Sequence, residues 1–403
     1  MTRYRKIILI ILAAAVFLTG CWNRRELNEL AIGVAIGIDK QDEGYKFTAQ
    51  IINPGKVAGK EAGGDSRTNV QTFIGEGKTL FDAWRNLTRE APRKMYFTHV
   101  QVVVIGEELA REGITRPLDP MLRDHEFRQD YYLLITSENQ RAETAMNILT
   151  SLEEVPALKI TGMLEASSKN NGVGTIYTLD EVVGDLVSDG KELALSGILV
   201  EGDPEEGETL SSLEQSNLSS KLLINELGIF KEDRLIGWLE AEDSKAYNYT
   251  QGNVKSTSEQ IKCNDEGKGI ISIEVLENNT KIKTEIKDNV PEAVINVDIK
   301  GNVANVECEK DLTDNKELEK LEKQFEKHTK KIIEHLIEIV QTKKKTDIIG
   351  IGEAVHKYNP KYWKKNKQKW EEIYPETKIT VNVNASIQHI GATGKPPASG
   401  GGQ

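Results

Sequence analysis

The chain has 403 residues, of which 38% are hydrophobic and 29% charged, with 33 glycines and 11 prolines. This composition is typical of globular proteins and the length suffices for two or three domains, so collagen-like and wholly disordered chains are excluded. The 52 lysines and arginines against 63 acidic residues give a net charge of −11, which argues against nucleic acid as a partner. Three cysteines are too few for a disulfide scaffold.

Residues 1–20 have the order of a secretory signal peptide: basic residues, an apolar run over 7–18, then small residues. The run is shorter than the roughly 20 residues of a transmembrane helix. It ends in Leu18-Thr19-Gly20-Cys21, which resembles a bacterial lipobox, and an uncleaved signal anchor would leave this order unexplained. We therefore predict cleavage before Cys21 and acylation of its thiol, which would hold the mature chain on the outer face of a membrane.

Residues 21–200 are predicted to form a mixed α/β region. The segments 30–39 and 45–52 have the apolar pattern of a β-hairpin. Thr79 is placed to cap a helix over 80–87. Further strands are expected at 100–105, 131–136 and 193–200, and further helices at 107–111, 142–149, 159–168 and 180–186. Such alternation favours layers of helices packed on a sheet.

The segment 201–218 interrupts this pattern with glycine, proline, serine and acidic residues, so we predict a linker there and a second domain over 219–390. The second domain is expected to begin with strands near 222–230 and 235–238 and a helix at 241–249. Asn278-Asn279, Asp288-Asn289 and Gly301-Asn302 then suggest turns between four strands of an antiparallel meander. The four strands are expected at 269–276, 281–287, 293–300 and 303–308.

A capping box at Asp314 predicts the start of a long helix that ends near residue 343. Two helices, 347–358 and 362–370, a strand over 378–390 and a disordered tail over 391–403 complete the chain. The predicted fold class is therefore α+β or mixed α/β. It is multidomain, with mixed sheets flanked by helices and with the meander of the second half packed on the long helix.

The sequence offers no catalytic, cofactor-binding or metal-binding motif. Gly75–Thr79 lacks the first glycine of a P-loop, and Ser196 lacks one glycine of the G-x-S-x-G pattern. His328 and His335 are seven residues apart, too far for one turn of a helix, so we interpret both as lying on a solvated helix face. We predict neither an enzyme nor a bound cofactor or metal.

Lysines and aromatic residues alternate between residues 343 and 370. An amphipathic helix with Trp363 and Trp370 on one face explains this pattern, and contact of Trp363 with anionic lipid or a partner is the alternative. Cys263 and Cys308 lie at the edges of the predicted meander. Outside the cytoplasm they can form a disulfide, but two buried free thiols are equally compatible with the sequence.

Short segments along nearly the whole mature chain carry a family resemblance. The most specific is Cys21-Trp22-Asn23-Arg24-Arg25-Glu26-Leu27-Asn28-Glu29-Leu30, followed by Gly37-Ile38-Asp39. The others are Asn53-Pro54-Gly55, Arg85-Asn86-Leu87-Thr88, the segment 105–110, Leu235-Ile236-Gly237-Trp238, Lys281-Ile282-Lys283, the segment 347–353 and Trp363. In these segments the chain resembles the Ger(x)C family, the lipoprotein C subunits of spore nutrient-germinant receptors.

The resemblance implies a lipoprotein of the spore inner membrane, required for nutrient-triggered germination, that works with two integral-membrane subunits, of A type and B type. It implies no catalytic residue. Trp22, Arg24 and Arg25 are suited to the headgroup interface of a membrane, although a plain tether is the alternative. A competing function is that of an extracytoplasmic lipoprotein that binds a small ligand and passes it to a membrane transporter. The two unlike halves of the chain argue against the paired similar lobes of such proteins.

Overall fold

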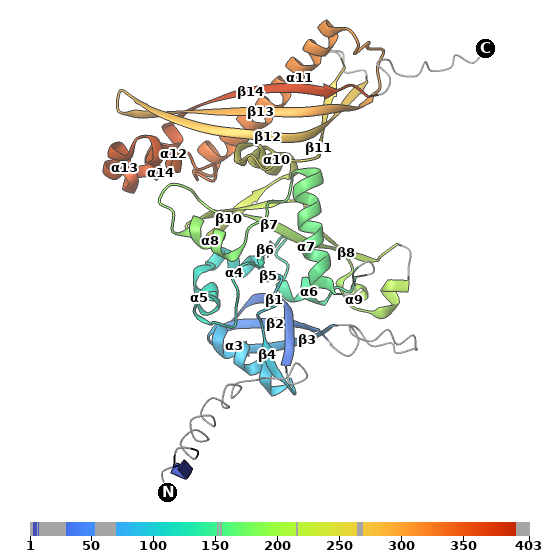
Figure 1. Ribbon diagram of the computed structural model, residues 1–403, viewed down its shortest axis with the longest axis vertical. Coiled ribbons are helices and arrows are strands. Elements are labelled where there is room, and N and C mark those ends of the chain that lie inside the picture. The colour runs from blue at the N-terminus through green and yellow to red at the C-terminus, as the bar shows by residue number, and fades with distance from the viewer. Residues whose placement is uncertain are drawn as a thin grey trace, which may run out of the picture.

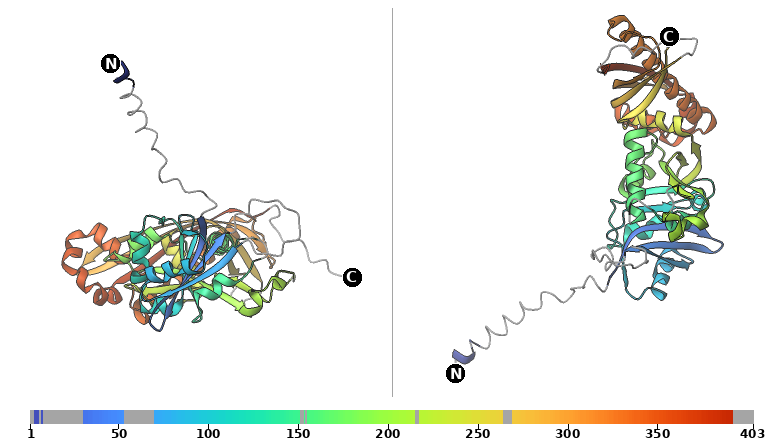
Figure 2. Two further views of the ribbon diagram at one scale, coloured as in Figure 1. Left: turned by 90° about the horizontal axis from the view of Figure 1, so that it is seen from below. Right: turned by 90° about the vertical axis from the view of Figure 1, so that its right-hand side faces the viewer.

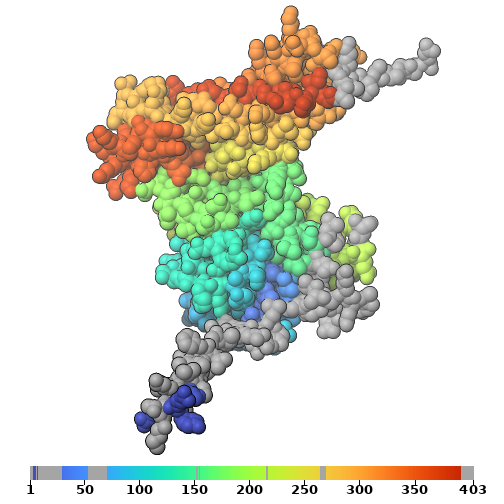
Figure 3. Space-filling model, viewed as in Figure 1, coloured from blue at the N-terminus to red at the C-terminus, as the bar shows by residue number. Residues whose placement is uncertain are grey.

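The computed structural model describes residues 3–5, 7, 30–52, 70–150, 153, 155–214, 217–263 and 269–391. Two β-sheets with packed helices lie at different levels along the long axis of the molecule (Figure 1). The N-terminal strands lie near one end of this axis and the C-terminal sheet lies at the other (Figure 1), and the colours of the space-filling view follow the same order (Figure 3). The predicted fold class, mixed sheets flanked by helices with a long helix in the second half, is confirmed.

The first sheet has ten strands in the order β10-β9-β7-β6-β5-β1-β2-β3, with β4 paired to β1 and β8 to β7. Its parallel centre consists of β1, β5, β6 and β7, and antiparallel hairpins extend both sides. The strands are β1 (Leu30–Gln41), β2 (Gly44–Ile52), β3 (Val70–Gly77), β4 (Lys94–Tyr96), β5 (Val102–Ile105), β6 (Tyr132–Thr136), β7 (Ala194–Gly202), β8 (Ser220–Leu223), β9 (Leu227–Lys231) and β10 (Arg234–Leu239).

Helices cover both faces of the first sheet, which is why its central strands are almost continuously apolar. In β5, Val103 and Ile105 contribute to one buried cluster, whereas Val102 and Val104 contribute to the cluster on the opposite face. Thr79 caps α3 by accepting a hydrogen bond from the Asp82 amide, as predicted. The helices are α3 (Leu80–Asn86), α4 (Glu107–Glu112), α5 (Thr115–Arg123), α6 (Ala142–Asn147), α7 (Pro156–Ala166), α8 (Leu179–Leu186) and α9 (Pro204–Gly207).

The predicted linker at 201–218 does not separate the two sheets, because β8, β9 and β10 follow it and still pair within the first sheet. Part of the segment is itself ordered as α9 and a 3-10 turn over Leu210–Glu214. Side chains of β9 and β10 nevertheless pack in the core of the C-terminal sheet, among them Leu227, Ile229 and Leu239. The hairpin is therefore shared by both halves. The segment 201–218 connects β7 to β8, two strands of the first sheet.

The second sheet has four strands in the order β11-β12-β13-β14. The first three are antiparallel, as expected for a meander, whereas β14 runs parallel to β13. The strands are β11 (Thr257–Lys262), β12 (Ile270–Lys287), β13 (Val290–Val306) and β14 (Lys378–His389). The helices of this half are α10 (Ala241–Gln251), α11 (Asn315–Glu338), α12 (Ile351–Tyr358), α13 (Pro360–Asn366) and α14 (Trp370–Ile373). Helix α11 packs against this sheet, as the right-hand view of Figure 2 shows.

Where the sequence analysis predicted four short strands, the structure has two long ones, β12 and β13, so this prediction was wrong. Only Asp288-Asn289 forms a turn, and both residues have positive φ, 49° and 65°. Asn278 lies instead beside a bulge in β12, where its side chain accepts a hydrogen bond from the Val254 amide and donates one to the Tyr249 carbonyl. Gly301 lies opposite that bulge, where an added Cβ would approach Ile273 to 2.8 Å.

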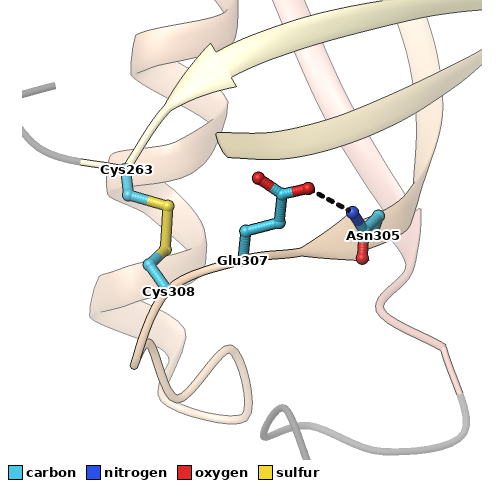
Figure 4. The surroundings of a disulfide bond; sticks show 4 residues. All are labelled: Cys263, Asn305, Glu307 and Cys308. Atoms are coloured by element: carbon cyan, nitrogen blue, oxygen red, sulfur yellow. Dashed lines mark hydrogen bonds between the residues drawn. A yellow bond between two sulfur atoms is a disulfide. The ribbon is translucent and has the colours of Figure 1, made fainter. Parts of the chain in front are cut away.

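Cys263 and Cys308 are joined in a disulfide, with their Cα atoms 6.3 Å apart (Figure 4). Cys263 follows β11 and Cys308 lies just beyond β13, so the bond ties the outer ends of these two strands together. Close to the bond, the Asn305 side chain donates a hydrogen bond to Glu307 at 3.3 Å.

Candidate functional site

Three of the segments that carry the family resemblance are organised around a buried carboxylate. The first is Asp39 at the end of β1, whose two oxygens accept hydrogen bonds from the Ala142 and Glu143 amides at 2.7 and 2.9 Å. Asp39 thereby caps the start of α6 and fixes it to the central strand. Burial raises the pKa of Asp39, and the two amide donors act in the opposite direction. Gly106 must be glycine here, because an added Cβ would lie 2.2 Å from the Asp39 carboxylate.

The second buried carboxylate, Glu107, joins two segments far apart in the sequence. It begins α4 and accepts hydrogen bonds from the Arg111 guanidinium at 2.5 Å, the Asn139 amide at 2.6 Å and the Trp238 indole at 3.1 Å. Trp238 lies on β10, and its ring is so close to Gly197 that an added Cβ there would be 2.6 Å from it. The resemblance segments 105–110 and 235–238 therefore form one joint.

The third buried carboxylate, Asp347, accepts four hydrogen bonds. Three come from the amides of Gly350, Ile351 and Gly352 at 2.7 to 3.0 Å, and the fourth comes from the Trp370 indole at 3.0 Å. Gly350 has φ of +89°, and an added Cβ on Gly352 would lie 2.7 Å from the Trp370 nitrogen. The glycines of the segment 347–353 thus allow the backbone to wrap around one carboxylate.

Burial raises the pKa of Asp347 to about 6, against the effect of its four donors. The folded chain therefore holds a proton on Asp347 between about pH 4 and pH 6 that the unfolded chain has released, and the resulting stabilisation is lost as pH rises through this window. We expect the difference in unfolding free energy between the wild type and Asp347→Asn, which cannot titrate, to shrink by about 2 kcal/mol from pH 4 to pH 6.

Urea titrations of both chains across this window measure the difference. A difference that does not change with pH would show that Asp347 has an ordinary pKa.

The chemistry of these three sites is structural, because every one of the carboxylates is already occupied by backbone or indole donors. Among the residues that the structure describes, no three His, Cys, Asp or Glu side chains are grouped as a metal site would require. Within the same residues, no helix combines the length and the hydropathy needed to cross a membrane.

A fourth buried acid, Glu259 on β11, was not singled out by the sequence analysis. Its carboxylate accepts a hydrogen bond from the Tyr249 hydroxyl at 3.0 Å and lies 3.3 Å from the Lys245 ammonium and 3.1 Å from His328. These partners lower the pKa of Glu259 although burial acts to raise it. His328 is therefore paired rather than solvated, which corrects the sequence interpretation. A hollow of about 500 Å³ adjoins the group where α10, β11 and α11 meet the loop after α7.

A second polar network connects the region around α8, in the N-terminal half, with α10 in the C-terminal half. The Lys191 ammonium lies 3.0 Å from Asp185 and 3.1 Å from the Tyr177 hydroxyl, which in turn lies 3.2 Å from the Tyr247 hydroxyl on α10. Asn248, the next residue of α10, donates hydrogen bonds to backbone carbonyls between residues 172 and 174. The junction between the sheets is thus closed by buried hydrogen bonds in addition to apolar contacts.

The predicted site residues fall into two groups. Cys21, Trp22, Arg24 and Arg25 lie outside the described residues. Trp363 is only 2% exposed and packs edge-on against Trp370 at 5.3 Å between ring centres, so it is a core residue and not an interface anchor. The reason is the seven-residue spacing, which places both indoles on the inner side of successive helices while the intervening lysines face outward.

The architecture is that of a known structural class. It matches the crystal structure of the GerBC protein with a TM-score of 0.53 and 22% identity, over 88% of this chain and 96% of the other, and this likeness establishes the fold. The chain belongs to the spore germination B3/GerAC-like family. Residues 23–199 match the model of the spore germination protein N-terminal domain and residues 225–391 the model of the B3/GerAC-like C-terminal domain.

Relatives of similar length match this chain over nearly all of its sequence. Spore germination protein KC of Bacillus subtilis (strain 168) is 30% identical over 98% of both chains. Spore germination protein A3 of the same organism is 26% identical, over 96% of this chain and 98% of the relative. Spore germination protein B3 is 24% identical, over 94% and 96%. The resemblance inferred from short segments is therefore confirmed as family membership.

Proposed function

We propose that this protein is the lipid-anchored C subunit of a nutrient-germinant receptor in the spore inner membrane. In this proposal, acylated Cys21 holds the chain on the extracytoplasmic face, where it binds the two integral-membrane subunits, of A type and B type, and catalyses no reaction. The observation that carries the proposal is family similarity to spore germination proteins across both halves of the chain.

The buried joints support a role as a rigid subunit that works through its surfaces. Asp39 and Glu107 tie helices to the first sheet, and Asp347 and Lys191 lie in hydrogen-bond networks near the junction with the second half. Networks whose polar groups are satisfied specify one arrangement of the parts they join. A chain of this kind presents fixed surfaces to its partners.

Deletion of the gene tests the proposal. We expect spores without the protein to lose their response to at least one nutrient of a panel, while agents that bypass nutrient receptors still trigger germination. Reintroduction of the wild-type gene should restore the response. Unchanged responses to every nutrient, or an equal loss with the bypassing agents, would contradict a receptor role.

The hollow beside Glu259 is a feature that favours the alternative function, a ligand-binding lipoprotein that supplies a transporter. The two sheets differ in strand number and direction, so they do not form the paired lobes of such a protein. A nutrient bound by this chain alone should stabilise it by about 2.7 kcal/mol at a hundredfold excess over its Kd. Thermal unfolding with the nutrient panel measures this shift, and its absence throughout favours the receptor subunit.

A further inference from the structure

A second hollow, of about 500 Å³, opens on the N-terminal half where the end of α4, the start of α5 and the β9–β10 turn meet. Its lining contains five charged side chains, Arg111, Glu112, Arg116, Asp233 and Arg234. The hollow adjoins the joint of Glu107 and Trp238, because Arg111 pairs with Glu107 and Arg234 begins the strand that contains Trp238.

Each of the two acids that line this hollow has a partner within the chain. Glu112 lies 2.5 Å from the Lys40 ammonium. The Asp233 carboxylate accepts a hydrogen bond from the Thr115 amide at 3.3 Å. Gly113, between these elements, has φ of +134°, and an added Cβ would lie 2.7 Å from the Asp233 carboxylate. The turn is therefore held in a conformation that suits glycine, and it keeps Asp233 facing the start of α5.

Of the three arginines that line the hollow, only Arg111 forms an ion pair with a described residue. Arg111 is paired with Glu107 at 2.5 Å. Arg116 and Arg234 are exposed, and the side chain of neither has a hydrogen bond or ion pair with any residue that the structure describes. The hydroxyl of Tyr45, which also lines the hollow, has no hydrogen-bond partner in the same described part of the chain. The uncommitted hydrogen-bond donors of the hollow are thus two guanidinium groups and a phenol.

We propose that this hollow binds a small anion of the carboxylate or phosphate type, held by Arg116 and Arg234 with the Tyr45 hydroxyl as a further donor. A guanidinium group presents its N–H donors in a planar fork that matches two oxygens of such an anion. A bound anion would also offset the positive charge of the two guanidinium groups that line the hollow.

Two kinds of ligand present such an anionic group, a free anion and the phosphate of a lipid headgroup, and the experiment distinguishes between them. The chain of residues 21–403 carrying Cys21→Ala, which cannot be acylated, is titrated with inorganic phosphate and with succinate by calorimetry. The same chain is sedimented with phosphatidylglycerol vesicles and with phosphatidylcholine vesicles. Saturable binding of a free anion assigns the first source, and binding to the anionic vesicles alone assigns the second.

The double variant Arg116→Ala, Arg234→Ala tests the residues. We expect its affinity to fall about tenfold or more, because charge-assisted hydrogen bonds to the anion are lost. Lysine at both positions keeps the charge but not the fork, so it should retain part of the affinity. The matched control is Arg89→Ala, Arg93→Ala, which removes two exposed arginines that do not line this hollow and should bind as the wild type does.

All these positions are exposed, so each variant is expected to unfold at the wild-type temperature. The absence of saturable binding in both the calorimetric and the vesicle arm would overturn the proposal. An equal loss in the control pair would overturn it too, since the binding would then reflect total charge rather than this hollow.

Discussion

Replacing Asp347 with alanine is expected to lower the free energy of unfolding by about 4 kcal/mol or more, because an unpaired buried donor costs about 1–3 kcal/mol. The change removes the acceptor of three backbone amides and of the Trp370 indole, all within a buried site. The carbonyl of Asp347 also accepts a hydrogen bond from the Glu192 amide, just before β7 of the first sheet. The loss should therefore reach the junction between the two halves of the chain.

Asp314→Ala is the matched control for this prediction. Asp314 is also an aspartate that caps a helix, since its carboxylate accepts a hydrogen bond from the Lys316 amide at 2.9 Å, but it is exposed to solvent. Loss of an exposed cap costs about 1 kcal/mol. Urea unfolding of both variants gives the comparison. Equal losses would mean that the Asp347 site is hydrated and that its donors find water when the carboxylate is removed.

Elements with a strong local pattern could be predicted from the sequence. The hairpin of β1 and β2 was predicted from its apolar runs, which form strands with few exposed residues. The long helix α11 and the last strand β14 each bury one face that recurs at the period of its secondary structure. Trp363 and Trp370 follow the same rule, and the helical interpretation of their spacing is the one that agrees with their burial. In these places the local periodicity and the tertiary packing select the same conformation.

Features that depend on distant partners could not be predicted in this way. Asn278-Asn279 has the composition of a turn, but Asn278 finds the backbone of residues 249 and 254 as its partners and remains within a long strand. Glu259 on β11 contacts His328 on α11, a residue 69 positions away. The shared hairpin of β9 and β10 is a similar case, because its backbone pairs with one sheet while some of its side chains pack with the other.

The candidate site was partly predictable for the same reason. The segments 105–110, 235–238 and 347–353 were recognised through the family resemblance, but nothing local indicated that each contains or contacts a buried carboxylate joint. Glycines that tolerate no Cβ, such as Gly106 beside Asp39, were the available signal. Their meaning depends on which backbone or side chain approaches them, and that is decided by the tertiary fold.

Loss of the Cys21 thiol is expected to abolish membrane attachment. Each buried methylene of an acyl chain contributes about 0.8 kcal/mol, so two or more chains hold a protein stably on a bilayer whereas one myristoyl chain does not. We therefore expect the mature wild-type chain to sediment with membranes and to yield an N-terminal peptide with an acylated Cys21 in mass spectrometry. The chain of residues 21–403 with Cys21→Ala should remain in the supernatant.

The matched variants keep Cys21 and change the residues beside it, Trp22→Ala and the pair Arg24→Ala, Arg25→Ala. If these side chains only lie at the headgroup interface, both variants should stay on the membrane, because the acyl chains alone provide stable anchoring. Full sedimentation of the Cys21→Ala chain would show that the protein is held by other contacts. In that case, release of the Trp22→Ala or the double arginine variant would identify those contacts and replace the lipid anchor with a surface attachment.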